Sequence, residues 1–385
     1  MSELEYRTAG ESHGQALVAL VEGLPADVPV DLDLINHELT RRQGGYGRSG
    51  RQKIEKDGVK ILSGVRAGQT MGGPIAMLIA NRDSRLEEAP PVHAPRPGHA
   101  DLAGSLKWLT TDCRNTLERA SARETAARTA AGALTRSLLA AFGIELVGFV
   151  VRIGATAAEV AVDLSCDQIA KLRDASDVYC PDESAGEAMK LAIDQARRDG
   201  DTLGGVVEVR AFGVCPGLGS CVSSRDKLDG RLMGAVGSIQ AIKGVEIGLG
   251  FTAASRLGSD VHDPIGFDED SVELPTLGFT RESNNAGGIE GGMTNGQPVV
   301  LRAAMKPIST LRQGLPSVDL RTKESHRSDY ERSDVCAVPA LSVIVENVVA
   351  FELARALLEK FGGDTLAEVR AAYDHYLNAA RRLSS

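Results

Sequence analysis

The most chemically suggestive stretch of the sequence is TAGESHGQALV, residues 8–18, in which Ser12 stands directly beside His13. A serine hydrolase needs the hydroxyl and the imidazole within hydrogen-bonding distance. If the segment is extended, adjacent side chains point to opposite faces of the strand. The serine also lacks the GxSxG frame of a nucleophile elbow. The pattern therefore disfavours a nucleophile and leaves two interpretations of His13, a structural turn histidine or a histidine that carries protons.

A second group of ionisable residues occurs in APRPGHADLAG, residues 94–104, where Arg96, His99 and Asp101 fall close together. The prolines stiffen this segment, and Gly98 lets the backbone pass close to a neighbour. A metal site would need more ligands near His99, and the sequence offers neither HExxH nor a close cysteine. An arginine that holds an oxyanion beside a histidine that supplies a proton suits an anionic leaving group better.

Arginines also flank the glycine-rich loop GGYGRSG, residues 44–50, at Arg41, Arg42, Arg48 and Arg51. The loop follows an expected helix rather than a strand. It lacks the GxGxxG fingerprint of dinucleotide-binding proteins, and no GK[ST] follows as in a P-loop. We interpret it as an arginine-rich lid over a small polyanion.

The segment 117–133, LERASARETAARTAAGA, places Arg119 and Arg123 four residues apart, which is one face of a helix. A solvated helix with intrahelical ion pairs to Glu118 and Glu124 is the simpler interpretation. The small residues between the two arginines would instead let a flat ligand come close to the helix.

Three segments nearer the C-terminus complete the set: AGGIEGGMTNG (286–296), MKPIST (305–310) and ERSDVCAVPA (331–340). They offer backbone N–H groups, Lys306 and hydroxyls to a phosphate, and an Arg332/Asp334 pair. Together the basic segments predict a pocket for something small and multiply anionic, without a conventional nucleophile or a metal cage. That composition indicates proton and electrostatic chemistry on a phosphorylated carboxylate, with an organic cofactor as one option.

The overall composition indicates which classes of partner and which cellular compartment to expect. The 385 residues carry a net charge of −9, which argues against nucleic acid or an anionic membrane as the main partner. No apolar run approaches the roughly 20 residues that cross a bilayer, and the first residues do not resemble a cleavable leader. The six cysteines form no CxxC pair, as expected of reduced thiols. We therefore expect a cytoplasmic protein.

Hydrophobic periodicity predicts the elements that must position these residues. We expect helices over 32–42, 113–142 (ended by Gly143), 182–199, 338–361 and 365–383. We expect strands on both sides of a turn within 3–22, and over 59–65, 74–79, 147–155, 204–214 and 298–304. Segment 81–94 should be an exposed excursion, and 267–285 and 309–333 should be irregular. The helix around 341–358 is apolar on all sides, so it should be buried. Residues 1–385 should form one integrated α+β domain.

The sequence resembles the chorismate synthase family in order and over nearly its whole length. The resemblance rests on nine blocks: TAGESHG (8–14), RRQGGYGRSGR (41–51), KILSGVRAGQTMGGPIA (60–76), RPGHADLAG (96–104), RNTLERASARETAARTAAGA (114–133), IQAIKGVEIGLGF (239–251), NNAGGIEGG (284–292), MKPIST (305–310) and RSDVCAVPALSVIVEN (332–347). It implies a β-α-β-α sandwich, with a central layer of long helices between antiparallel sheets, that assembles as a homotetramer.

The resemblance also implies the last step of the shikimate pathway. In that step 5-enolpyruvylshikimate 3-phosphate (EPSP) loses phosphate and a C6 hydrogen by anti-1,4-elimination and becomes chorismate. The family requires reduced FMN although the reaction has no net redox change. With no reductase domain visible in the chain, we expect a separate flavin reductase, and NADPH would be an indirect reductant.

The same resemblance implies roles for individual residues. His13 would sit by the flavin and maintain its protonation state, with Ser12 in the adjoining relay. His99 would protonate the departing phosphate, and Asp334 would act near flavin N5 in removing the C6 proton. The substrate would be held by Arg42, Arg48, Arg96, Arg123 and Arg332. The flavin would contact Arg42, Arg48, Ser121, Ala122, Arg123, Gln240, Ala241, Gly291, Lys306, Pro307, Ile308, Ser309, Thr310 and Arg332.

Three features stay without an assigned role: Arg51, the segment 81–94 and the segment 260–280. Two other functions compete with the lyase. A metal-dependent or nucleophilic phosphatase acting on a similar anion would need a metal cluster or an activated nucleophile, which the sequence does not offer. A non-enzymatic anion-binding module would make the histidines dispensable.

Overall fold

The structure is a computed structural model that describes residues 3–50, 56–328 and 333–383. Helices and antiparallel strands share the chain, which confirms the α+β class. In the described residues, no helix is long and apolar enough to cross a membrane.

The first sheet is antiparallel and is built from the N-terminal quarter of the chain. Its strand order is β1-β2-β7-β4, with β1 (Glu5–Ala9), β2 (Ala16–Glu22), β7 (Ile75–Ala80) and β4 (Val59–Ile61). Alternate residues of β2 are buried, so one face of this sheet packs on the core. A small sheet beside it has the order β3-β6-β5, with β3 (Ala26–Pro29), β6 (Gln69–Met71) and β5 (Val65–Arg66).

The second large sheet is also antiparallel and has the order β11-β16-β10-β8-β9. Its strands are β11 (Ile242–Ile247), β16 (Val299–Met305), β10 (Gly205–Phe212), β8 (Glu145–Ile153) and β9 (Thr156–Ala157). The middle of β8 is buried in a continuous run, because helices contact this strand from both sides of the sheet.

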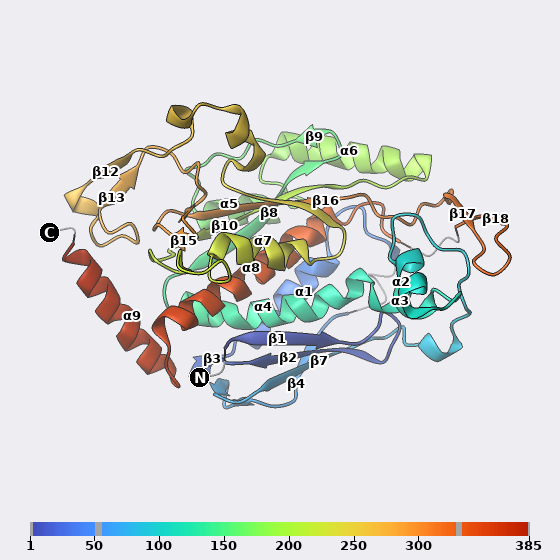
Figure 1. The fold of residues 1–385 in the computed structure, drawn as a ribbon, viewed down its shortest axis with the longest axis horizontal. Coiled ribbons are helices and arrows are strands. Elements are labelled where there is room, and N and C mark those ends of the chain that lie inside the picture. Colours follow the sequence, from blue (N-terminus) through green and yellow to red (C-terminus); the bar gives the residue numbers. More distant parts are fainter. Residues whose placement is uncertain (1–2, 51–55, 329–332, 384–385) are drawn as a thin grey trace.

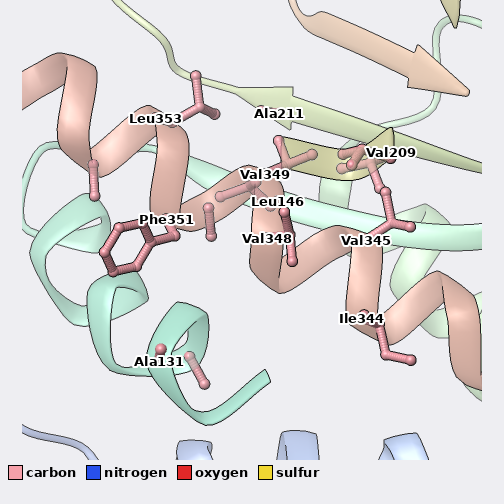
Figure 2. Packing of buried hydrophobic residues seen from close by; sticks show 14 of the residues in the cluster. Ala131, Leu146, Val209, Ala211, Ile344, Val345, Val348, Val349, Phe351 and Leu353 are labelled. Carbon is pink, nitrogen blue, oxygen red and sulfur yellow. The ribbon is translucent and has the colours of Figure 1, made fainter. Parts of the chain in front are cut away.

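A layer of helices lies between the two sheets: α1 (Leu32–Gln43), α4 (Thr125–Ala140) and α8 (Val338–Phe361) (Figure 1). Helix α4 contacts β2 and β7, whereas α8 contacts β8 and β10. Figure 2 shows Val345 and Val349 of α8 packed against Val209 and Ala211 of β10. As predicted, α8 is buried on nearly every side. Helices α4 and α8 cross so closely that a Cβ on Gly132 would lie 2.0 Å from the carbonyl oxygen of Asn347.

Shorter elements surround these layers. The other helices are α2 (Asp101–Trp108), α3 (Arg114–Arg119), α5 (Cys166–Asp174), α6 (Glu183–Asp199), α7 (Leu228–Gly237) and α9 (Leu366–Arg381). The 3-10 turns are η2 (Leu86–Glu88), η3 (Ala122–Glu124), η4 (Gly250–Ser255), η5 (Gly258–Asp260) and η6 (Glu269–Ser271). The hairpins are β12 (Ile265–Phe267) with β13 (Phe279–Arg281), β14 (Ile289–Glu290) with β15 (Met293–Thr294), and β17 (Pro316–Val318) with β18 (Ser325–Arg327). Helix α2 ends in the only tryptophan of the sequence, Trp108, which is exposed.

Two structural expectations were wrong. The single helix expected over 113–142 is broken into α3, η3 and α4, because Ser121 is extended and its hydroxyl accepts from the backbone N–H of Arg123. The segment 81–94 is not wholly exposed, because Asn81, Val92 and Ala94 are buried. Helices α5 and α7 and strand β11 were not expected, and hairpins occupy parts of the segments expected to be irregular.

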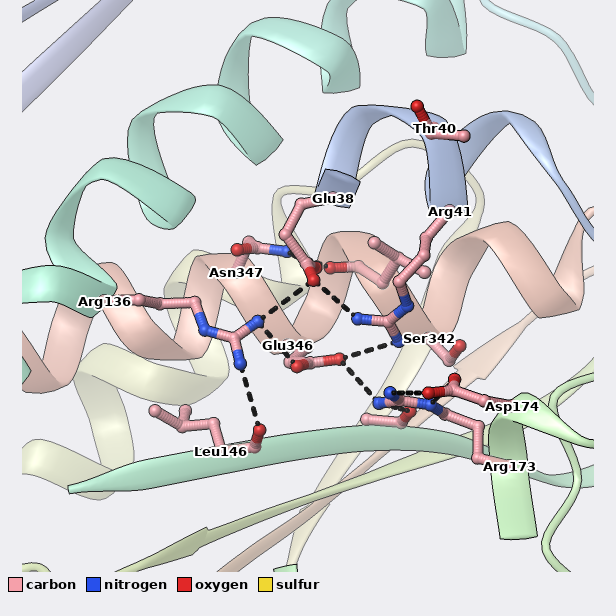
Figure 3. Close-up of polar contacts among 12 residues, drawn as sticks. Glu38, Thr40, Arg41, Arg136, Leu146, Arg173, Asp174, Ser342, Glu346 and Asn347 are labelled. Carbon is pink, nitrogen blue, oxygen red and sulfur yellow. Dashed lines mark hydrogen bonds and ion pairs between the residues drawn. The ribbon is translucent and has the colours of Figure 1, made fainter. Parts of the chain in front are cut away.

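Charged residues of the helix layer and of α5 form an ionic cluster that consists of Glu38, Arg41, Arg136, Arg173 and Glu346 (Figure 3). All of them are buried except Arg136, which is partly buried. Glu346 of α8 lies 3.2 Å from Arg41 of α1, 2.8 Å from Arg136 of α4 and 3.5 Å from Arg173 of α5. Glu38 lies 2.7 Å from Arg41 and 3.3 Å from Arg136. The cluster therefore links four helices across the interior.

Candidate active site

A cavity of about 770 Å³ collects most of the residues that the sequence singled out. Its lining draws on segments from residue 12 to residue 344, so the complete fold is needed to form it. The predicted residues that line it are Ser12, His13, Arg42, Arg48, Arg96, His99, Ser121, Ala122, Arg123, Gln240, Ala241, Lys306, Pro307, Ile308, Ser309, Thr310 and Asp334.

The glycine-rich loop reaches the cavity by docking on the segment before α8. Gly47 has a φ of 94°, and its carbonyl accepts from the backbone N–H of Val335 at 2.9 Å. This contact sets Arg48 against Asp334, with 3.0 Å between the guanidinium and the carboxylate. The backbone N–H of Ser49 donates to the same carboxylate at 2.6 Å. Asp334 is thus held at the cavity wall by one charge and one N–H.

Two of the predicted arginines share a buried carboxylate that the sequence did not single out. Asp57 lies 3.3 Å from Arg42 and 2.7 Å from Arg123, and its side chain is fully buried. Burial lowers the pKa of Arg42 to about 9; the charge of Asp57 acts against this, and the charges of Arg123 and Arg48 lower the pKa further. A guanidinium still keeps its proton at neutral pH. The lowered pKa therefore marks a place where positive charge is crowded and an anion would be stabilised.

The break between α3 and α4 sends the two arginines of this segment in different directions. Arg119 is exposed and donates to the carbonyl of Thr8 at 3.3 Å. Arg123 is buried and donates to the side-chain oxygen of Asn81 at 2.9 Å. The expectation that both share one helix face was therefore wrong, and only Arg123 lines the cavity.

His99 and Arg96 converge on the buried carboxylate of Asp101, the first residue of α2. The Nδ1 of His99 contacts Oδ1 of Asp101. Arg96 donates to Oδ2 of Asp101 from Nε at 2.8 Å and from its backbone N–H at 3.1 Å, and it also donates to Thr310 at 3.1 Å. Burial acts to raise the pKa of Asp101, but the hydrogen bonds from His99 and Arg96 outweigh it and hold the pKa well below its usual range.

His13 lies in the turn between β1 and β2, against a second buried carboxylate. Its Nδ1 and its backbone N–H both lie 2.9 Å from Oε2 of Glu118, and its Nε2 lies 3.8 Å from Asp83. Ser12 accepts from the hydroxyl of Ser121 at 3.2 Å. Ser12 and His13 lie in the turn that was expected between the two strands of 3–22, so the extended conformation considered for this pair does not apply. The carboxylate partner of His13 nevertheless fits proton handling rather than nucleophile activation.

Another part of the lining, called the apolar wall, combines apolar surface with a few polar groups. It includes Ile239, Ala241, Pro307 and Ile308, with Lys306 donating to the carbonyl of Gly98. Burial lowers the pKa of Lys306, and the charge of Lys243 lowers it further. Within the described part of the chain, the side-chain oxygen of Gln240 is buried without a hydrogen-bond partner. A flat, partly polar ring system would suit this wall, because apolar surface would cover its face and Gln240 would gain a donor.

Among the assigned residues that the structure describes, Gly291 is not brought to the cavity. Gly291 lies in the turn between β14 and β15 and does not line it, so the structure does not support a flavin contact of Gly291 in the same chain. Arg332 and Arg51 lie outside the described residues.

The carboxylates Asp57, Asp83 and Glu118 are what sequence reasoning missed. Glu118 was interpreted as part of a solvated helix, and Asp83 lies in the segment expected to be exposed. None of the three belongs to a spacing motif, so no local pattern could have assigned it. Together with six arginines and lysines and two histidines in the lining, these acids make a site that can bind an anion and move protons. Among the described residues, no group of histidine, cysteine and acidic side chains could hold a metal ion.

The comparisons with known proteins decide the family. The family model "Chorismate synthase" matches residues 4–358. The chain is 54% identical to the chorismate synthase of Desulforamulus reducens, over 99% of this chain and 100% of that protein. It is also 54% identical to that of Geobacter sulfurreducens, over 98% of this chain and 99% of that protein. A solved structure described as "Crystal Structure of Chorismate Synthase" superposes with a TM-score of 0.80 at 43% identity, and 99% of each chain is covered.

The chain belongs to the chorismate synthase family. It is therefore a carbon–oxygen lyase of the last step of the shikimate pathway. This confirms the resemblance stated from the nine sequence blocks.

Proposed function

We propose that the cavity converts EPSP into chorismate and phosphate in the presence of reduced FMN. The observation that carries the proposal is the convergence of Arg42, Arg48 and Arg123 with His99 and Asp334 around one cavity. EPSP carries two carboxylates and a phosphate, so it offers three anionic groups to this cationic lining.

The arginines bind the substrate and stabilise the charge that develops as phosphate leaves. Arg42 and Arg123 are held by Asp57, and Arg48 is held by Asp334, so their guanidinium groups are in place before an anion arrives. Fixed charges in a partly desolvated cleft stabilise a leaving anion more than they would at an exposed surface. Arg96 binds the substrate through those guanidinium N–H groups that do not donate to Asp101 or Thr310. Arg332 completes the set as the resemblance implies.

Two side chains move the protons of the elimination. His99 gives a proton from Nε2 to the leaving phosphate oxygen, since its Nδ1 is engaged by Asp101. Asp334 accepts the proton from C6 of the substrate. The substrate loses its phosphate, which takes the proton of His99, and its C6 proton, which Asp334 takes, so the products are chorismate and phosphate with no net oxidation.

The apolar wall would hold reduced FMN through Ser121, Ala122, Gln240, Ala241 and the segment 306–310. When bound, reduced FMN would supply an electron transiently that eases cleavage of the C–O bond, with no net change in its own oxidation state. His13 would hold a proton beside it, backed by Glu118 and with Ser12 and Ser121 in the adjoining relay. The unpartnered oxygen of Gln240 supports this placement.

Several wider properties belong to the same proposal. The chain forms one domain over 1–385 with the β-α-β-α sandwich of the family, supported by the helix layer between two antiparallel sheets. It works as a cytoplasmic homotetramer. A separate reductase keeps FMN reduced, with NADPH as the indirect source of electrons.

An anaerobic assay with EPSP tests the proposal by comparing photoreduced FMN with oxidised FMN plus NADPH. We expect chorismate with the first alone and no inhibition by EDTA. His99→Ala should keep FMN and EPSP binding and lower kcat by about 10²- to 10⁴-fold, the usual contribution of a general acid. His37→Ala, at an exposed position on α1, is the matched control. Phosphate release without chorismate, or full turnover of His99→Ala, contradicts the proposal.

A further inference from the structure

Four donors surround the buried carboxylate of Asp101, and they divide between its two oxygens. Oδ2 accepts from the backbone N–H and from Nε of Arg96. Oδ1 faces Nδ1 of His99 and, at 3.1 Å, Nη2 of Arg96. Nη2 also lies 3.0 Å from Nδ1 of His99, but Oδ1 is the nearer partner of that ring nitrogen and accepts from Nη2 as well. The side chain of Asp101 is fully buried, so no solvent competes for these positions. Each oxygen is therefore committed to particular partners.

We infer that Asp101 is a positioning residue that keeps the ring proton of neutral His99 on Nδ1 and turns Nε2 toward the substrate. The inference rests on the proposed function, because it explains how His99 serves as the acid for the leaving phosphate. An ionised carboxylate has no hydrogen to donate, so the ring nitrogen that faces it must carry one. The other nitrogen then exchanges the reacting proton, and the carboxylate stabilises the doubly protonated ring from which that proton is given.

Arginine keeps this carboxylate ionised and oriented. Arg96 binds both oxygens of Asp101, which fixes the plane of the carboxylate and with it the plane of the imidazole. No acidic side chain of the described ranges forms an ion pair with Nε2 of His99, whereas His13 has Glu118 at Nδ1 and Asp83 near Nε2. The two histidines are thus set up differently, and His99 is the one whose second nitrogen can serve the substrate.

The substitution Asp101→Asn reverses the hydrogen-bond polarity at one atom. The amide oxygen can replace Oδ2 and keep the backbone N–H and Nε of Arg96, whereas Nη2 of Arg96 loses its acceptor Oδ1. The amide NH₂ then faces Nδ1 of His99, which must become an acceptor, so the ring proton moves to Nε2. Asp112→Asn is the matched control, because a single oxygen of Asp112 accepts both from Val92 and from Arg114, and asparagine can supply it.

Solid-state ¹⁵N NMR of ring-labelled histidine, in protein without flavin, reads the tautomer directly. His99→Gln identifies the signals of His99 among the seven histidines. We expect the proton on Nδ1 in the wild type and in Asp112→Asn, and on Nε2 in Asp101→Asn. In the anaerobic assay Asp101→Asn should lower kcat at least about 100-fold, within the range of general acid catalysis. KM for EPSP should change less than about threefold, because uniform substrate binding is kept.

The double variant His99→Gln/Asp101→Asn separates positioning from a structural role. If Asp101 acts through His99, the second substitution lowers kcat of His99→Gln less than about threefold, since coupled residues are not additive. A further large loss, an unchanged tautomer or a kcat near that of the wild type overturns the inference. A wild-type protein that makes no chorismate overturns the proposed function instead, and the NMR result then still decides what Asp101 does to His99.

Discussion

Replacing Glu346 by glutamine should destabilise the protein by about 3 to 5 kcal/mol, the usual cost of removing one partner from a buried ion pair. Glu346 is almost wholly buried and faces three arginines of the ionic cluster. In the variant, Arg41 and Arg136 would share the single carboxylate of Glu38, and Arg173 would keep the carboxylate of Asp174. The amide of glutamine keeps one acceptor oxygen, so the loss is mainly that of the charge.

The pH dependence of this contribution has a defined sign. Burial acts to raise the pKa of Glu346, but Arg41, Arg136 and Arg173 outweigh it and lower the pKa below its ordinary value of 4.5. A carboxylate whose pKa is lower in the folded state stabilises the fold above its unfolded pKa. The difference between wild type and Glu346→Gln should therefore be constant above about pH 5 and shrink as the pH falls through the lowered pKa.

Urea unfolding followed by circular dichroism, at one fixed protein concentration, measures this free energy. Glu359→Gln is the control, because Glu359 is 38% exposed and its ion pair with Arg231 lies at the surface. Such pairs contribute about 0 to 1 kcal/mol. A loss below about 1 kcal/mol in Glu346→Gln, or a difference that persists unchanged in acid, would refute the reasoning.

Three further predictions concern the site and the helix layer. Asp57→Asn should lower kcat/KM for EPSP about tenfold in steady-state assays, because the two cavity arginines lose the carboxylate that orients them. Glu118→Gln should lower kcat at least about tenfold with intact FMN binding, because the imidazole of His13 loses its charged partner. Gly132→Ala should lower stability by about 1 to 3 kcal/mol in thermal unfolding, because its Cβ would collide with the carbonyl of Asn347.

Each of these has an outcome that contradicts it. Unchanged kcat/KM in Asp57→Asn would mean that Arg42 and Arg123 do not need Asp57 to orient them. Full turnover in Glu118→Gln would mean that His13 does not need the charge of Glu118. Gly234→Ala is the control for the glycine, since α7 leaves open space at that position. Equal melting temperatures for the two alanine variants would show that α4 and α8 can separate without cost.

Long apolar runs were the most predictable part of the fold. Helix α8 begins and ends at Val338 and Phe361, as expected, because its apolar run contains no breaker and Pro339 falls in its first turn. The strands β8, β10 and β16 were likewise found from continuous apolar stretches. These elements are buried, and a buried element is recognisable in the sequence as a continuous run of apolar residues.

The break in the helix expected over 113–142 shows that helix propensity alone does not locate a helix end. Alanine, leucine, glutamate and arginine favour a continuous helix there. The tetrapeptide Ser121–Glu124 nevertheless has the S-x-x-E pattern that often starts a helix, and Ser121 does accept from the N–H of Arg123. This helix-start pattern was present in the sequence, but the prediction gave more weight to the helix-favouring residues on both sides of it.

The histidines and arginines of the site were predictable, but the acids behind them were not. Asp83 lines the cavity, and Asp57 contacts two of its arginines, only because distant segments pack together. A lone acidic residue in a polar stretch is usually solvated. The excursion over 81–94 was expected to be exposed for the same reason. Its first residue, Asn81, is buried because it bonds to Arg123.

The position of Trp108 gives the protein a fluorophore of its own. Helix α2 is eight residues long and runs from Asp101, the partner of the proposed acid, to the single tryptophan of the chain. An emission change on addition of EPSP or phosphate would therefore originate from this one helix. We therefore expect that its emission follows ligand binding next to His99 in the unlabelled protein, in real time and before any turnover.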